Sequence, residues 1–234
     1  MEREFSKPLN EPPGFLSTIS MVEDDRSAIV ENLIQAERKS PSRYEPAKAL
    51  FCRVLEGDVS VGQAIAHAHS VAELVERKCA AEVLQASKEF LARQTPAHIG
   101  PLPPMSISIP NGLRLNISSV LFRHLDPERL MVLHFWRKPL TDWQLGAAGA
   151  VLRLALSRHQ PKLANREIDF ISVPFPEFAP HRHFEHYDWA KLKPLNDRDL
   201  QRFWGQFCDA WSIYKGREPR QIKRRRPPDM FSRR

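Results

Sequence analysis

The chain has 234 residues, of which 42% are hydrophobic and 27% charged, and its formal net charge is +7. This balance is typical of a globular protein with a buried core and excludes a wholly disordered chain. No segment approaches the roughly 18 uninterrupted apolar residues that a membrane-spanning helix requires, and the first five residues mix both charges where a secretory signal would be apolar. The three cysteines, Cys52, Cys79 and Cys208, are odd in number and widely spaced, so we expect no disulfide framework and a cytoplasmic protein.

The excess positive charge lies at the C-terminal end of the chain. Residues 215–234 contain nine basic and two acidic residues, whereas the other 214 residues contain 26 of each. Four consecutive basic residues precede a proline pair: Lys223, Arg224, Arg225 and Arg226. Such a block attracts phosphate groups without reading base sequence, and it resembles a basic nuclear-import signal. The alternative is a flexible extension that keeps the protein in solution and has no dedicated partner.

The first 104 residues are predicted to contain helices and no strand. Residues 1–25 are punctuated by prolines and lack a sustained hydrophobic period, so we expect them to be disordered. Apolar residues at helical spacing predict helices near 26–36, 46–56, 61–67 and 71–91, the last of them opening at a capping box over residues 70–73. Residues 94–104 contain four prolines and are expected to be a stiff connector. The helical layer and this connector together span 26–104.

From residue 105 the hydrophobic period changes to two. Residues 106–109 and 113–117 alternate on either side of Pro110-Asn111-Gly112, and an Asn-Gly pair between such runs strongly indicates a hairpin whose second strand continues to residue 122. A third strand over 130–137 is apolar on both faces, as expected for a central strand. A capping box at Thr141 then opens a helix, in which Gly146 and Gly149 would allow a close approach to the sheet. Residues 168–173 form a short apolar strand that ends at a proline.

A final helix is expected from about residue 196 to residue 213. Its aromatic residues recur at helical spacing, which favours a core-facing side over a platform for base stacking: Phe203, Trp204, Phe207 and Trp211. Residues 105–214 therefore form the main core, and a basic flexible tail follows over 215–234. The expected fold class is α+β, with an N-terminal helical layer, an α-β-β-β-α-β core around a small mixed sheet, and a C-terminal helix.

This order of elements resembles the common core of the PD-(D/E)XK nuclease-like superfamily over roughly residues 70–174. In that family the second strand supplies an aspartate, and the third supplies an acidic residue and a lysine, which together hold Mg²⁺ and position water. The resemblance implies a degenerate cleft formed by four residues: Asn116, Ser118, His134 and Lys138. Only Lys138 matches the family's motif, and without clustered carboxylates Mg²⁺ has no binding site. The resemblance therefore implies that nuclease chemistry has been lost, and we expect no cofactor.

The densest group of potential metal ligands follows the last predicted strand. It consists of His181, His183 and His186, with Glu185 and Asp188 nearby. In an extended segment His181 and His183 would project to the same side, and imidazole nitrogens are common zinc ligands. The alternative is a polar surface loop whose aromatic residues pack on the final helix, because the spacing matches no established metal motif.

Three functions are compatible with these patterns. The one we favour is a non-catalytic adaptor that binds nucleic acid or an acidic protein surface through its basic tail. The sequence contains no glycine-rich phosphate loop and no serine-nucleophile motif. The alternatives are a metal-dependent hydrolase built on His181, His183 and His186, and an oligomeric scaffold with a tryptophan-rich C-terminal helix at its interface. No association with a membrane is expected.

Overall fold

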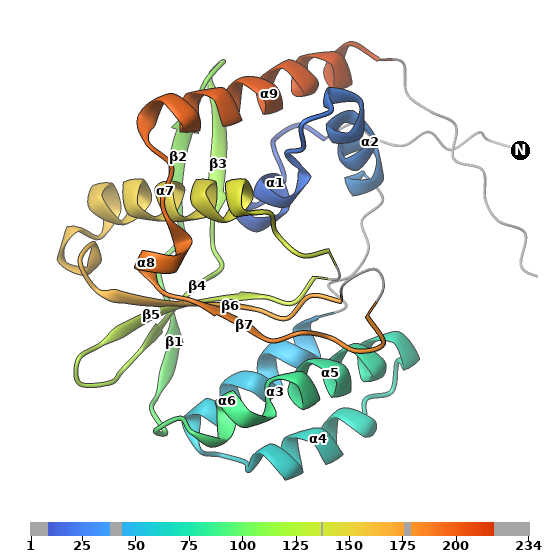
Figure 1. The fold of residues 1–234 in the computed structure, drawn as a ribbon, viewed down its shortest axis with the longest axis vertical. Helices are drawn as coiled ribbons and strands as arrows, with labels where there is room; N and C mark the ends of the chain where they lie inside the picture. Colours follow the sequence, from blue (N-terminus) through green and yellow to red (C-terminus); the bar gives the residue numbers. More distant parts are fainter. Residues whose placement is uncertain (1–8, 38–43, 137, 176–178, 218–234) are drawn as a thin grey trace, which may run out of the picture.

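The computed structural model of the protein describes residues 9–37, 44–136, 138–175 and 179–217. A five-stranded sheet lies in the middle of the molecule, and helices cover both of its faces (Figure 1). Four helices cover one face, whereas a long helix, a β-hairpin and further helices lie on the other. The α+β class predicted from the sequence is confirmed.

The central sheet is mixed and has the strand order β1-β4-β5-β6-β7. Its strands are short: β1 (Ile99–Pro101), β4 (Val120–Arg123), β5 (Arg129–His134), β6 (Glu167–Ser172) and β7 (Glu185–Tyr187). β5 and β6 run parallel, and the other neighbouring pairs are antiparallel. Helix α7 (Asp142–His159) joins the parallel pair, because parallel neighbours need a long crossover connection.

Alternating side chains of the central strand enter two separate cores. Leu130 and Val132 of β5 belong to the first core, which also contains the buried side of α7. Met131 and Leu133 belong to the second core, which contains the helices on the opposite face. All four side chains are at most 3% exposed. This burial on both faces explains the almost continuous apolar sequence of β5.

Four helices form the layer over the second core: α3 (Glu45–Glu56), α4 (Val61–His69), α5 (Leu74–Ala86) and α6 (Lys88–Ala92). Gly57 ends α3 with a φ of 83°, a left-handed value that favours glycine. Ser60 and Gln63 form a reciprocal capping box at the start of α4. The single helix predicted over 71–91 is instead two helices that meet at the buried Ser87, and α5 begins after Glu73.

The remaining elements surround α7 or connect to it: α1 (Phe15–Met21), α2 (Arg26–Ala36), β2 (Met105–Ile109), β3 (Leu113–Ile117), the 3-10 helix η1 (Pro161–Leu163), α8 (Trp189–Leu192) and α9 (Asp197–Gly216). Helix α2 packs against α9 and not against α3–α6, the helical layer in which we expected it. Phe203 and Phe207 of α9 are fully buried, as the aromatic spacing predicts. None of the helices in the described ranges is long and apolar enough to span a membrane.

Helix α1 lies within the N-terminal segment that we expected to be disordered. Phe15, Ile19 and Val22 are at most 2% exposed and belong to the first core. Gln144 of α7 donates hydrogen bonds from Nε2 to the carbonyl oxygens of Ser20 and Val22, at 3.2 and 2.8 Å. This helix is so short that its apolar spacing gives no sustained period in the sequence. Residues 1–8 lie outside the described residues.

The predicted hairpin forms, and both residues of the Asn111-Gly112 turn have positive φ, at 63° and 71°. It is a separate two-stranded sheet, because the strand predicted over 113–122 ends at Ile117 and the chain restarts as β4 in the central sheet. Strand β1 lies in the segment predicted to be a connector, at a sheet edge where Pro101 is tolerated. The predicted order α-β-β-β-α-β has residues 106–109 and 113–122 as its first two strands, but residues 105–117 instead form the separate hairpin. The chain order after α6 is β1, β2, β3, β4, β5, α7 and β6.

Candidate anion-binding site

A cavity of about 300 Å³ lies beside the central sheet, on the face covered by α3–α6. We name it the arginine pocket after the residues that line it, chiefly Arg93, Arg123, Arg129, Asp169 and His186. Phe90 of α6 and the coil residues Gln94 and Thr95 line its helical side. The pocket therefore joins the end of the helical layer to four strands of the sheet.

The strand register brings the polar side chains of the pocket to one face. Arg123 and Arg129 are direct partners across the antiparallel pair β4–β5, so both project to the same side of the sheet. Asp169 of β6 is the partner of Met131, which lies two residues beyond Arg129 on β5. Side chains two residues apart on a strand share a face, so Asp169 joins the arginines on the side where Met131 enters the second core. His186 of β7 contacts Asp169 there.

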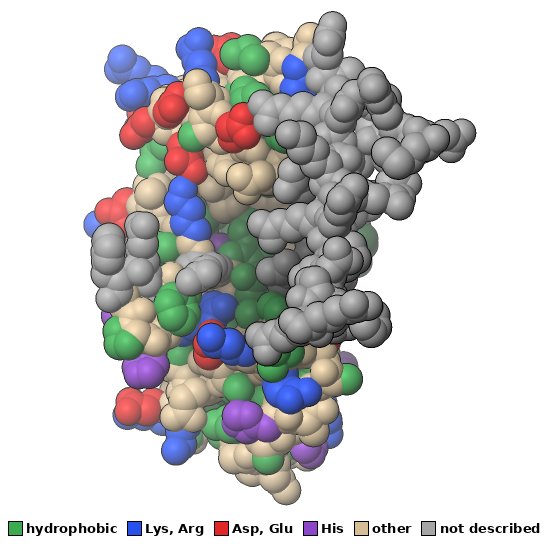
Figure 2. Space-filling view, turned by 90° about the vertical axis from the view of Figure 1, so that its right-hand side faces the viewer, with side chains coloured by type: hydrophobic (Ala, Val, Ile, Leu, Met, Phe, Trp, Pro, Cys, Tyr) green, Lys and Arg blue, Asp and Glu red, His purple; other side chains and the backbone are tan. Residues whose placement is uncertain are grey.

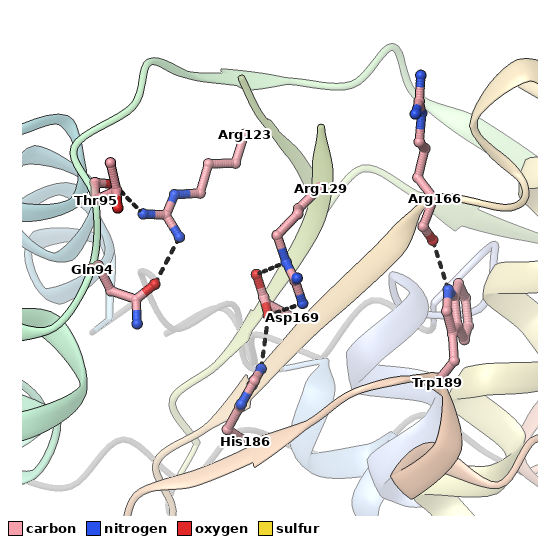
Figure 3. A network of polar contacts seen from close by, with 8 residues as sticks. All are labelled: Gln94, Thr95, Arg123, Arg129, Arg166, Asp169, His186 and Trp189. Carbon is pink, nitrogen blue, oxygen red and sulfur yellow. Dashed lines mark hydrogen bonds and ion pairs between the residues drawn. The ribbon is translucent and has the colours of Figure 1, made fainter. Parts of the chain in front are cut away.

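Two side chains hold Asp169, which is the acidic group of the pocket (Figure 3). Arg129 contacts it in a bidentate manner, with Nε donating to Oδ2 and Nη2 to Oδ1, both at 2.9 Å. His186 Nε2 lies 2.8 Å from Oδ1. Burial raises the pKa of Asp169, but hydrogen bonds from His186 and Arg129 outweigh burial and hold this pKa below its usual value. The carboxylate is therefore ionised and already engaged.

Arg123 is a buried cation, with 2% of its surface exposed. Its Nη1 donates to Gln94 Oε1 at 2.9 Å, and its Nη2 donates to the carbonyl oxygen of Thr95 (Figure 3). Both acceptors are neutral, and Nε is buried without a hydrogen-bond partner. Burial lowers the pKa of Arg123; Asp169 opposes this shift and Arg129 adds to it. A guanidinium nevertheless stays charged at neutral pH, so Arg123 holds a buried positive charge against neutral acceptors.

The charges that line the pocket do not balance. Its inner charged groups, Arg123, Arg129 and Asp169, carry an excess of one positive charge, and the largely exposed Arg93 adds a second at the rim. Glu89 lies 3.8 Å from Arg93, but both side chains are largely exposed, and such pairs interact weakly in water. Among the described side chains on the face drawn in Figure 2, lysine and arginine side chains are scattered among acidic ones. The arginine pocket, by contrast, concentrates positive charge and is suited to an anion.

The four residues expected to form a nuclease-like cleft do not meet. Asn116 is exposed on β3, in the separate hairpin, and Ser118 is exposed in the link that follows β3. His134 is fully buried, with Nδ1 3.1 Å from a serine hydroxyl and Nε2 unpartnered. Lys138 is exposed and pairs with Glu23 at 2.6 Å. The physical reason is the break after Ile117, which places β3 outside the sheet that contains His134.

The three histidines predicted as metal ligands are also separated. His181 and His183 are exposed, whereas His186 is partly buried against Asp169. Arg182 lies between the first two and is 7% exposed, because it donates Nη1 hydrogen bonds to carbonyl oxygens just beyond the ends of β5 and β6. Within the described ranges, no group of three or more histidine, cysteine or acidic side chains is placed to hold a metal ion. The expected ligand set therefore does not form, and His186 has a different role.

Arg123, Arg129 and Asp169 were not predicted as site residues. Asp169 had a recognisable signal, since it lies between Ile168 and Phe170 in a buried strand, and a buried carboxylate needs a partner. The sequence does not identify that partner, because Arg129 is 40 residues away from Asp169 in the chain. The two arginines had no comparable signal, since arginines at strand ends are ordinary surface residues.

The predicted basic block, Lys223, Arg224, Arg225 and Arg226, lies outside the residues that the structure describes. A comparison with models of known protein families gave no match, and a comparison with curated proteins gave no significant match. Any assignment of function therefore depends on the arginine pocket and on the sequence itself.

Proposed function

We propose that the protein is a non-catalytic nucleic-acid-binding protein whose arginine pocket receives a phosphate group. The observation that carries this proposal is Arg123, a buried guanidinium with neutral acceptors and an unpartnered Nε. Asp169 attracts this charge but does not hydrogen-bond to it. A buried charge that lacks a charged hydrogen-bond partner is costly, so a site that keeps one is suited to binding an anion. The planar fork of a guanidinium also matches the spacing of phosphate oxygens.

The state of Asp169 supports binding over catalysis. Its two oxygens already accept hydrogen bonds from Arg129, and one of them also contacts His186. These interactions favour the ionised carboxylate and make it a weak base. Asp169 instead occupies Nε and Nη2 of Arg129 and fixes this guanidinium on the same face of the sheet as Arg123, so that both arginines line the same cavity.

We also propose that the fold is related to the PD-(D/E)XK nuclease-like core. Three strands that are antiparallel neighbours in the central sheet, β1, β4 and β5, support this relationship, although the hairpin β2–β3 lies between β1 and β4 in the chain. They are followed by α7 and by β6, which runs parallel to β5. β4 and β5 would be the strands that bear the family's motif, and neither contains an aspartate or a glutamate. The relationship is therefore compatible with binding of nucleic acid without its cleavage.

The proposal is tested by titrating the full-length protein into fluorescent single-stranded and duplex oligonucleotides. We expect binding that weakens as the salt concentration rises, because phosphate contacts release counterions. Arg123→Met should weaken binding about tenfold, the effect of losing a charge-assisted hydrogen bond. Arg158→Met is the matched control and should leave the affinity nearly unchanged, because Arg158 is an exposed residue of α7 on the opposite face of the sheet.

Three results would contradict the proposal. Binding of an acidic peptide without binding of any oligonucleotide would assign the pocket to a protein partner. Cleavage of plasmid DNA in Mg²⁺ or Mn²⁺ would show that the protein is catalytic. Alanine substitution of residues 223–226 tests the basic block separately: if this variant loses binding and Arg123→Met does not, the phosphate contact belongs to the tail.

A further inference from the structure

We infer that the arginine pocket recognises a terminal phosphate monoester, the phosphorylated end of a nucleic-acid strand, in preference to a phosphodiester within the strand. This inference rests on the proposed function, because it specifies which phosphate group enters the pocket. Three features of the pocket support it: its excess positive charge, the burial of Arg123 and the hydrogen bond between Arg123 and Gln94.

The excess charge of the pocket matches a dianion. Arg123, Arg129 and Asp169 carry an excess of one positive charge, and the exposed Arg93 adds a second at the rim of the pocket. A phosphate monoester carries a charge of about −1.5 to −2 at neutral pH, whereas each phosphodiester in a strand carries a single negative charge. A monoester therefore offsets nearly the whole excess, including the part on Arg123 that Asp169 does not neutralise.

The burial of Arg123 favours a phosphate group that is attached to the strand through a single oxygen. Arg123 is 2% exposed, and it lies at the base of a pocket of about 300 Å³ that is open to solvent. A monoester is attached through one oxygen, and its other three oxygens are strong acceptors that can reach a side chain below the surface. A phosphodiester has only two such oxygens, and its chain continues on both sides of them.

Gln94 provides an acceptor that a phosphate oxygen can replace. It follows α6 in coil, and its Oε1 accepts the hydrogen bond from Arg123 Nη1 at 2.9 Å. Replacement of this neutral amide oxygen by a phosphate oxygen gives a charge-assisted hydrogen bond, which is roughly twice as strong. The exchange needs only the rotation of one side chain, because Gln94 belongs to no helix or strand.

An aromatic wall lies beside the charged groups of the pocket. Phe90 and His186 both line the cavity, and their ring centroids are 5.5 Å apart. Phe90 also packs on Phe51 and Phe184, so these rings bound the phosphate position and are not a free platform for a base.

The experiment compares one oligonucleotide sequence in three forms, each labelled at an internal base. One form carries a 5′-phosphate, one a 3′-phosphate, and one has hydroxyl groups at both ends. We expect about tenfold tighter binding of one phosphorylated form than of the hydroxyl form. Arg123→Met should abolish this difference, whereas Arg158→Met should preserve it.

A second variant tests the inference even if Arg123→Met fails to fold. Gln94→Glu keeps the shape of the side chain and places a carboxylate next to Arg123 Nη1, where the phosphate oxygen would bind. We expect this variant to melt at a higher temperature than the wild type and to lose the preference for a phosphorylated end. Gln85→Glu makes the same charge change at an exposed position of α5 and should do neither.

The outcomes distinguish the inference from the proposed function. Equal affinity for all three forms would overturn the terminal-phosphate inference and leave nucleic-acid binding in place, whereas no binding of any form would overturn both. A preference that survives in both Arg123→Met and Gln94→Glu would place the terminal phosphate outside this pocket. A free nucleoside monophosphate that binds as tightly as the phosphorylated strand would show that the pocket serves a small nucleotide instead.

Discussion

Arg123 and Arg129 stand directly opposite each other on β4 and β5, two positive charges on one face of the sheet. Like charges in this arrangement repel and destabilise a strand pair. Asp169 hydrogen-bonds to only one of them, Arg129, and attracts Arg123 from a greater distance, while Arg123 donates to neutral oxygens. The pair therefore maintains a positive potential at this end of the sheet, and a bound anion would reduce the repulsion.

Phosphate should raise the melting temperature of the wild-type protein more than chloride does at equal ionic strength. A ligand that binds only the folded state stabilises it by mass action. Arg123→Met should lose most of this extra rise, and Arg158→Met should retain it. Thermal unfolding followed by circular dichroism in matched buffers measures the effect. Equal rises in all three proteins would show that phosphate acts only as a general stabilising salt.

Asp169→Asn should lower the free energy of unfolding by about 3 kcal/mol, because removing one partner of a mostly buried ion pair leaves the other charge uncompensated. The loss should be smaller in phosphate buffer, since a bound phosphate supplies negative charge to the same two arginines. Asp188→Asn is a matched control, because Asp188 caps α8 and asparagine caps a helix as well as aspartate. Urea unfolding in phosphate and in chloride measures both effects, and an equal loss in the two buffers would argue against an anion in the pocket.

The same carboxylate predicts an acid dependence of stability. The pKa of Asp169 is lower in the folded protein than its ordinary value of 3.8, so the unfolded chain binds this proton first as the pH falls. The stabilisation from ionised Asp169 is therefore complete above a pH of about 4 and is lost below it. The difference in unfolding free energy between the wild type and Asp169→Asn should shrink over that range. A difference that stays constant on acidification would contradict this role of the carboxylate.

His134 predicts a separate loss of stability on acidification, in a higher pH range than the loss that Asp169 causes. Burial lowers the pKa of His134 from 6.5 to about 4, and the positive charge of Arg182 acts in the same direction. Between these values the unfolded chain takes up a proton that the folded protein does not, so stability falls as the pH decreases from about 6.5 to about 4. The free energy of unfolding should therefore be about 2 kcal/mol lower at pH 5 than at pH 7.

His134→Asn tests this assignment, because asparagine can still hydrogen-bond to Ser172 Oγ, which lies 3.1 Å from His134 Nδ1, and does not titrate. Urea unfolding at pH 7 and pH 5 should show a smaller loss in the variant than in the wild type. His69→Asn, at an exposed position of α4, should keep the wild-type loss. If His134→Asn loses as much stability as the wild type, the pH dependence arises from other groups.

Local chemistry explains which parts of the fold were predictable. Asn111 and Gly112 both adopt positive φ, and Thr141 and Gln144 exchange the hydrogen bonds of the predicted capping box. Strand β1 has no such local signal, because Gly100 and Pro101 are typical of a connector until β4 pairs with them. The alternation over residues 113–117 breaks at Ser118-Ser119, where the chain changes sheets, but no proline or glycine marks that point as a turn.

Of the residues in the candidate site, only His186 was selected from the sequence, because it belongs to a histidine-rich segment. His186 was singled out for metal chemistry and does lie in the pocket, but its partner is Asp169 and not another histidine. Closeness in sequence was misleading for His181 and His183, because Arg182 turns inward between them. The pocket itself depends on the register of four strands, and register requires knowledge of long-range pairing.

A substitution at Gly146 tests how closely α7 packs on the segment that follows α8. We expected this glycine to allow a close approach to the sheet, but its close neighbours lie in the segment after α8: an added Cβ would be 2.9 Å from Leu195 Cδ2 and 3.0 Å from the carbonyl oxygen of Lys193. That segment cannot easily retreat, because Leu195 N also donates to Gly146 O at 3.0 Å. Gly146→Ala should therefore lower the free energy of unfolding by about 1–3 kcal/mol through overpacking.

Gly205 of α9 is the matched control for this substitution. A Cβ there would meet nothing within 4 Å, so Gly205→Ala should raise the free energy of unfolding by about 0.5–1 kcal/mol through the better helix propensity of alanine. Urea unfolding of both variants measures the two effects, and their opposite signs are the expected result. Stabilisation by alanine at both positions would mean that α7 does not pack against residues 193–195 as closely as the structure places them, since the helix propensity gained is the same at either site.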